Sequence, residues 1–65
     1  MGETILKRIE LRDYDLILYR RADGEYVIHH EHPESGSRFW GRYFGDDGEK
    51  ALERFNEMAL REGRV

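Results

Sequence analysis

The spacing of apolar residues changes along the chain, and the change separates two kinds of element. In "DYDLILYRRADGEYVIHHEH", residues 13–32, apolar and polar positions alternate around an Asp-Gly pair, which predicts a β-hairpin. In "GDDGEKALERFNEMALREGRV", residues 45–65, apolar residues recur every three or four positions, which predicts an amphipathic helix. The chain therefore combines a sheet with a C-terminal helix.

The turn of the hairpin decides which residues share a face. A two-residue turn at Asp23-Gly24 would pair Leu18 with His29 and leave both faces mixed. A three-residue loop over 22–24, with a bulge at Gly24, pairs Leu18 with Ile28 instead. We expect the longer loop because it gathers the apolar side chains on one face, as a half-buried sheet requires. That face carries Tyr14, Leu16, Leu18, Tyr26 and Ile28.

Two further strands are expected beside the hairpin. "SRFWGRYF", residues 37–44, predicts a third strand in which Phe39 and Tyr43 alternate with Trp40, Arg42 and Phe44. "TILKRIEL", residues 4–11, fits either one helical turn or a strand, and we favour a short edge strand.

The C-terminal helix carries its own start and stop signals. Asp46 is expected to cap it, with Glu49 three residues on, and Gly63 is expected to end it. Its apolar face is expected to be Leu52, Phe55 and Ala59, flanked by Ala51 and Met58. Residues 1–65 are thus expected to form a single α+β domain, with an antiparallel three- or four-stranded sheet and one helix packed on one face.

Length and composition narrow the class of protein. The 65 residues include no cysteine, so disulfides and thiolate zinc sites are excluded. The longest apolar run, Leu16 to Tyr19, is far too short to span a membrane, and no signal peptide is evident. We expect a cytoplasmic protein without contact to membranes. Its net charge of −3 is not the basic balance of a typical nucleic-acid binder.

The three histidines are candidates for metal binding or catalysis. His30 and His32 would project from the same face of a strand and are the best metal-ligand candidates in the chain. No third ligand is placed beside them, so we expect neither a metal site nor a cofactor. Ser35 and Ser37 lie on a loop tip rather than in a cleft, and so small a chain has little room for a pocket. We therefore expect a protein that is not an enzyme.

The sheet face opposite the helix is expected to lack a cover. Ile17, Tyr19 and Val27 project from it, and we place Trp40 there as well. A contiguous apolar patch on a small protein usually marks a contact with a partner. Aromatic residues and arginine are enriched in the cores of such interfaces. The predicted partner-binding residues are Ile17, Tyr19, Arg21, Val27, Trp40 and Arg42.

These features favour a small non-enzymatic interaction or regulatory protein that uses the open sheet face, such as an accessory or inhibitor protein of a phage or mobile element. One alternative is a β-β-β-α domain that reads the major groove of DNA with its sheet. A second alternative is a homodimer in which the same face forms the interface.

The β-β-β-α order resembles the arm-binding domains of phage-type integrases and AP2-type DNA-binding domains. This resemblance implies a sheet in the major groove, with Arg21, Arg38, Trp40 and Arg42 as contacts. The order is also similar to the last two-thirds of a double-stranded-RNA-binding domain, whose final helix begins with a basic phosphate-binding motif. Here the matching stretch is the acidic Asp46-Asp47-Gly48-Glu49, which would repel phosphate.

Overall fold

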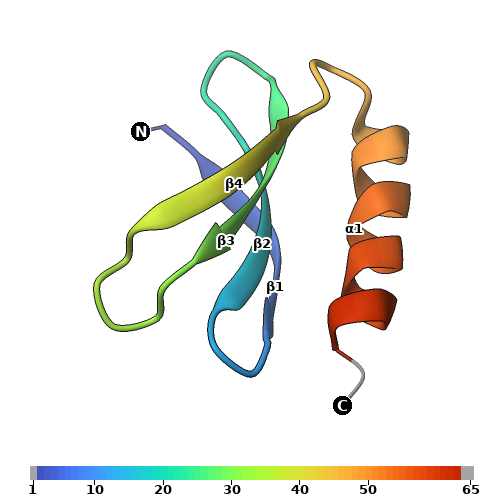
Figure 1. Cartoon of the computed structure of the whole chain (residues 1–65). Coiled ribbons are helices and arrows are strands. Elements are labelled where there is room, and N and C mark those ends of the chain that lie inside the picture. Colours follow the sequence, from blue (N-terminus) through green and yellow to red (C-terminus); the bar gives the residue numbers. More distant parts are fainter. Residues whose placement is uncertain (1, 64–65) are drawn as a thin grey trace.

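A four-stranded antiparallel sheet and one helix make up the fold (Figure 1). The computed structural model describes residues 2–63, so Met1, Arg64 and Val65 lie outside the described part. The strands follow one another in the sheet in the order β1-β2-β3-β4. The expected α+β class and the N-terminal edge strand are confirmed. The elements are β1 (Thr4–Glu10), β2 (Asp15–Arg20), β3 (Tyr26–Glu31), β4 (Arg38–Tyr43) and α1 (Gly48–Glu62).

The hairpin of β2 and β3 has the register that the apolar pattern predicts. Leu18 pairs with Ile28, and Leu16 pairs with His30. The N–H of Arg21 donates to the carbonyl of Glu25 at 2.8 Å and closes the three-residue loop. Gly24 ends that loop with a φ of 92°, a conformation that favours glycine. The three-residue loop is therefore the turn that places Leu16, Leu18 and Ile28 on the same face of the sheet.

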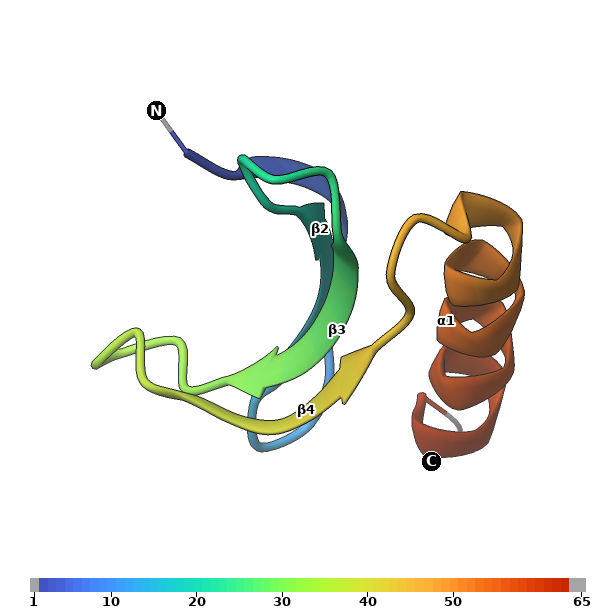
Figure 2. The same ribbon diagram turned by 90° about the horizontal axis from the view of Figure 1, so that it is seen from above.

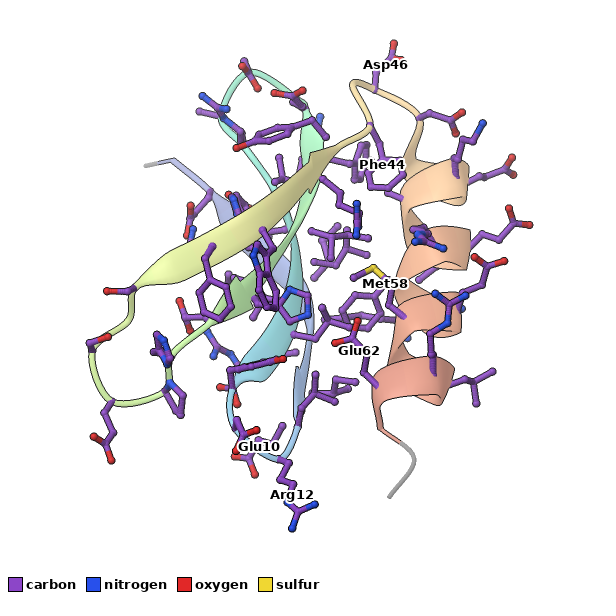
Figure 3. The ribbon with its side chains drawn as sticks, viewed as in Figure 1. Glu10, Arg12, Phe44, Asp46, Met58 and Glu62 are labelled. Atoms are coloured by element: carbon purple, nitrogen blue, oxygen red, sulfur yellow. The ribbon has the colours of Figure 1, made fainter. Side chains whose placement is uncertain are left out.

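The main core lies between the sheet and α1. Leu16, Leu18 and Ile28 pack against the helix, whose buried residues are Ala51, Phe55 and Met58. Figure 3 shows Met58 and Phe44 pointing into this layer. The helix is rotated relative to our prediction, because Leu52 is 39% exposed and Ala51 is fully buried. In residues 2–63, no helix has the length and the apolar run needed to cross a membrane.

The helix begins one residue later than predicted. Its N-cap is Asp47, whose carboxylate accepts a hydrogen bond from the Lys50 N–H at 3.0 Å. The prediction of Asp46 as the cap is wrong, since Asp46 lies one residue outside and points away from the helix (Figure 3). Gly63 follows the last helical residue, as predicted. Its N–H donates to the carbonyl of Ala59 at 2.8 Å, in a right-handed rather than a left-handed conformation.

The sheet is strongly curved, and α1 covers its convex side (Figure 2). The concave side encloses a second small core of Ile17, Tyr19 and Val27, which are 0%, 5% and 0% exposed. The prediction that this face is uncovered is therefore wrong. Because the sheet twists and curves, its concave face shields these three side chains from water, whereas a flat sheet would leave them exposed.

A bulge in β4 decides where Trp40 lies. Phe39 pairs with His30 and Arg42 pairs with Ile28, so both Trp40 and Gly41 stand opposite His29. The extra residue turns Trp40 to the convex side, where it meets His30 and Tyr14, so its predicted place on the other face is wrong. Gly41 lies against the His29 ring, where a Cβ would collide with Nε2.

Candidate functional site

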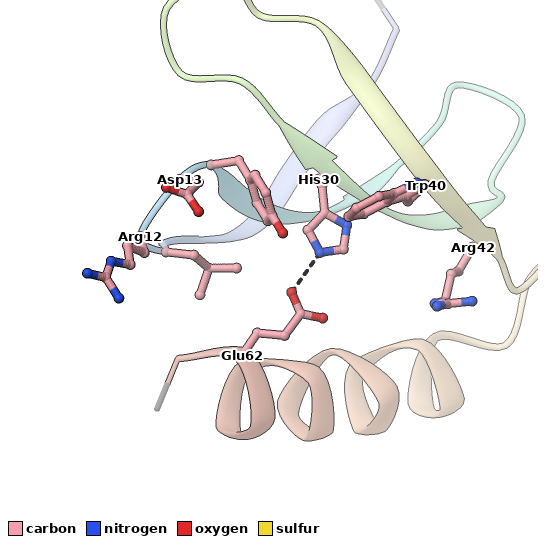
Figure 4. Close-up of a pocket in the computed structure, with 8 residues that line it drawn as sticks. Arg12, Asp13, His30, Trp40, Arg42 and Glu62 are labelled. Carbon is pink, nitrogen blue, oxygen red and sulfur yellow. Dashed lines mark hydrogen bonds and ion pairs between the residues drawn. The ribbon is translucent and has the colours of Figure 1, made fainter. Parts of the chain in front are cut away.

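A cleft lies on the convex side, between the β1–β2 loop, β4 and the C-terminal end of α1 (Figure 4). Its volume is about 460 Å³, which is enough for one or two side chains of a partner. We call it the Trp40 cleft. It is lined by Leu11, Arg12, Asp13, Tyr14, His30, Trp40, Arg42 and Glu62.

Trp40 is the most unusual residue of the cleft. Its side chain is large and apolar, yet the residue is 64% exposed. The indole is held edge-to-face against Tyr14, His30 and Phe39, with ring centroids 6.1, 5.3 and 4.9 Å away. Its φ is 56°, a left-handed conformation that costs a non-glycine residue about 1–2 kcal/mol. The bulge therefore places an aromatic ring at the surface at a cost to the backbone.

His30 forms the floor of the cleft. The residue is 3% exposed, and its Nε2 lies 2.8 Å from Oε1 of Glu62 (Figure 4). A carboxylate only accepts, so the proton of this hydrogen bond is carried by Nε2. The other nitrogen, Nδ1, is buried and has no hydrogen-bond partner within residues 2–63. A buried polar atom without a hydrogen bond lowers the stability by about 1–3 kcal/mol, so a hydrogen-bonding group from a bound molecule would be favourable at Nδ1.

Two arginines stand at the rim of the cleft. Arg12 and Arg42 are both exposed, and neither forms an ion pair with a residue in 2–63. Asp13 is also exposed at this rim. Arginine at the edge of an aromatic cleft suits hydrogen bonding or stacking with a bound group.

The concave face is closed by a network of charged residues. Arg8 donates to Asp15 at 2.8 Å and to Glu31 at 2.7 Å. Arg38 donates to Glu31 at 3.2 Å and to Glu3 at 2.6 Å, which links the beginnings of β1 and β4. The hydrogen bond from Arg8 lowers the pKa of Glu31, and that from Arg38 lowers the pKa of Glu3. Arg38 is thus occupied by carboxylates and is not free for phosphate.

His29 belongs to the concave side. Its Nδ1 forms a 2.8 Å hydrogen bond with the Tyr19 hydroxyl, and the two rings lie nearly parallel, 17° apart. Burial, together with the positive charge of Arg38, lowers the pKa of His29. His29 and His30 therefore lie on opposite faces of the sheet. Nδ1 of His29 is hydrogen-bonded, whereas Nδ1 of His30 has no partner within residues 2–63.

The structure brings together only part of the predicted contact surface. Trp40 and Arg42 line the Trp40 cleft, whereas Ile17, Tyr19 and Val27 are buried on the other side. Arg21 lies at the hairpin loop and pairs with Glu25 at 3.5 Å.

Sequence reasoning did not place several lining residues of the cleft in a site, among them Leu11, Arg12, Tyr14 and Glu62. Glu62 stands 32 positions from His30, and nothing in the sequence pattern links the two. The concentration of His and Trp residues in 29–40 was the one available signal, and it marks the right region.

The two metal-ligand candidates do not act together. His30 is buried and bonded to Glu62, whereas His32 is exposed and its ring lies 4.9 Å from that of Phe39. Across the described chain, no three His, Cys, Asp or Glu residues are grouped so as to hold a metal ion.

Comparisons with protein-family models, with curated proteins and with solved structures found no match. The function is therefore argued from the Trp40 cleft itself.

Proposed function

We propose that the protein is a small non-enzymatic interaction module that binds a segment of another protein in the Trp40 cleft. The observation that carries this proposal is Trp40, which is 64% exposed and held in a left-handed bulge beside a cleft of about 460 Å³. Tryptophan and arginine dominate the energetic centres of protein interfaces, and Arg12 and Arg42 line the same cleft as Trp40. The contact surface is thus moved from the concave face to the convex face.

The chemistry of the cleft supports binding rather than catalysis. Among residues 2–63, no serine, threonine, cysteine or lysine lines it, so the lining offers no aliphatic hydroxyl, thiol or amine as a nucleophile. Burial of Ile17 and Val27 argues against the concave face as a contact or dimer surface. Pairing of Arg38 with Glu3 and Glu31 argues against that face as a DNA-binding surface. A regulatory role in the cytoplasm, as in accessory proteins of phages or mobile elements, agrees with the small, cysteine-free chain.

The test is a selection of random displayed peptides against the wild-type protein. We expect enriched peptides whose dissociation constants rise roughly 30-fold on Trp40→Ala, because loss of an interface tryptophan typically costs about 2 kcal/mol or more. Leu60→Ala is the matched control, since Leu60 is 68% exposed on the helix and does not line the cleft. Failure to enrich any peptide, or peptides that bind Trp40→Ala as tightly as wild type, would refute the proposal.

A further inference from the structure

The unpartnered nitrogen of His30 limits what the Trp40 cleft can bind. The hydrogen bond to Glu62 places a proton on Nε2, and in the neutral form of the ring Nδ1 then carries a lone pair and can only accept. The group that satisfies it must therefore donate a hydrogen bond. A carboxylate does not, and a purely apolar side chain would leave the buried nitrogen unpaired.

The opposite face of the same sheet shows which donor fits a histidine in this setting. There the Tyr19 hydroxyl lies 2.8 Å from Nδ1 of His29. The guanidinium of Arg38 stands over the Tyr19 ring, 4.6 Å from its centroid. A phenol thus engages an imidazole and an arginine at once.

The Trp40 cleft repeats these components, but no phenol is hydrogen-bonded to its imidazole nitrogen. The ring of Tyr14 lies edge-to-face with that of His30, with centroids 5.1 Å apart, and Nδ1 stays unbonded within residues 2–63. His30 supplies the free Nδ1, and Arg42 supplies a guanidinium that has no ion-pair partner in residues 2–63. Trp40 and Tyr14 add aromatic edges and faces against which a further ring can pack. We infer that the cleft takes a phenol whose hydroxyl donates to Nδ1 of His30, and that a protein partner supplies it as a tyrosine side chain. The protein origin of the phenol rests on the function proposed above.

Access to Nδ1 is controlled by Trp40. The nitrogen is turned toward the indole and is shielded from water (Figure 4). Because Trp40 is 64% exposed, its ring can turn aside without unpacking the main core. Binding of the phenol displaces the indole from Nδ1, so the fluorescence of this single tryptophan reports occupancy.

The test uses 4-methylphenol, the side chain of tyrosine, and 4-methylanisole, which has the same ring but no hydroxyl proton. Both are titrated at pH 8 while Trp40 emission is recorded. We expect wild type to prefer 4-methylphenol roughly tenfold, as for one hydrogen bond to a buried acceptor. His30→Phe should remove the preference, and His32→Phe, at an exposed position, should keep it. Equal binding of the two probes, or a preference that survives His30→Phe, would overturn the inference.

A second measurement covers the case in which His30→Phe does not fold. The ¹⁵N resonance of His30 Nδ1 in the wild-type protein should shift on addition of 4-methylphenol and stay in place with 4-methylanisole. Equal shifts with both compounds, or none, would refute the hydrogen bond.

The peptides selected for the proposed function separate the two proposals. They should contain tyrosine, and a Tyr-to-Phe change in the peptide should weaken binding roughly tenfold. Binding of 4-methylphenol without any selected peptide would keep the phenol site and overturn the protein partner. Peptides that tolerate the Tyr-to-Phe change would keep the interaction module and overturn the phenol.

Discussion

At the scale of single residues, Trp40 combines two features that are uncommon separately. A left-handed backbone is disfavoured for a large side chain, and a large aromatic ring is disfavoured at the surface. Both occur here, because the extra residue in β4 leaves Trp40 outside the regular alternation. The left-handed backbone is a property of position 40, whereas the exposed ring is a property of tryptophan. Substitutions at position 40 can therefore separate the cost of the backbone conformation from the contribution of the ring.

We expect Trp40→Gly to be more stable than Trp40→Ala by about 1 kcal/mol. Both changes remove the same ring contacts, but only glycine adopts a φ of 56° without strain. In an ordinary strand the order is reversed, because glycine loses more backbone entropy on folding. Urea unfolding of the two variants measures the difference. A more stable alanine variant would show that position 40 is not held in the left-handed region.

At the scale of elements, the sequence specified the ends and faces of the helix only to within one residue. Asp46 and Asp47 are neighbours of the same type, and each can serve as a cap. The choice depends on the chain that leads from β4, in which the N–H of Asp47 donates to the carbonyl of Phe44 at 3.1 Å. That turn places Asp47, rather than Asp46, at the N-cap of α1.

Asp47→Ala should lower the free energy of unfolding by about 1 kcal/mol, because the N–H of Lys50 loses its acceptor. Asp46→Ala, the neighbouring control, should change it by less than about 0.5 kcal/mol, as for an exposed residue outside the helix. Chemical denaturation of both variants tests this order. Equal losses would mean that the cap is shared between the two carboxylates.

At the scale of the whole molecule, curvature of the sheet creates a second core on the concave face, and ion pairs between charged side chains cover that core. Arg38 reaches Glu3 with two nitrogens and Glu31 with a third, so it joins strands at opposite edges of the sheet. A planar guanidinium is suited to such a bridge, whereas an ammonium group is a single point of contact.

Arg38→Lys should therefore lower the free energy of unfolding by about 1 kcal/mol, since the charge is kept but the forked hydrogen bonds are lost. Arg42→Lys is the control, because Arg42 is exposed and forms no ion pair within residues 2–63. It should change the stability by less than about 0.5 kcal/mol. Thermal and urea unfolding would show the difference, and equal effects would mean that the bridge contributes nothing.

His29 and two glutamates of the charged network determine how the stability responds to acid. The pKa of His29 in the folded protein is lowered from its usual 6.5 by burial, so the folded state resists protonation and stability declines as the pH falls below 6.5. The pKa values of Glu3 and Glu31 are lowered from 4.5 by hydrogen bonds from Arg38 and Arg8. Their contribution is present above pH 4.5 and is lost as the pH falls through the lowered values.

We therefore expect the melting temperature to fall in two stages between pH 7 and pH 3. His29→Gln should remove the upper stage, whereas His32→Gln, at an exposed position, should leave both stages in place. A melting temperature that is flat between pH 7 and pH 5 in the wild-type protein would contradict the assignment to His29.

The sequence by itself determined the central hairpin with its pairing, the strand that follows it and the C-terminal helix, whereas residues 4–11 fitted either a strand or a helical turn. Alternation in two strands admits only one register that gathers Leu16, Leu18 and Ile28 on one face, because a shift of one residue would move every side chain to the other face. Amphipathic spacing likewise determined that one helix would cover that face. These are local patterns, and local patterns can be recognised without coordinates.

Only the tertiary structure decided the curvature of the sheet, the bulge in β4 and the site. Burial of Ile17 depends on how far the sheet bends, and the place of Trp40 depends on one unpaired residue. The contact of His30 with Glu62 joins the third strand to the last turn of the helix. Such features arise from packing between elements distant in sequence, and the alternation of residues within one strand carries no record of them.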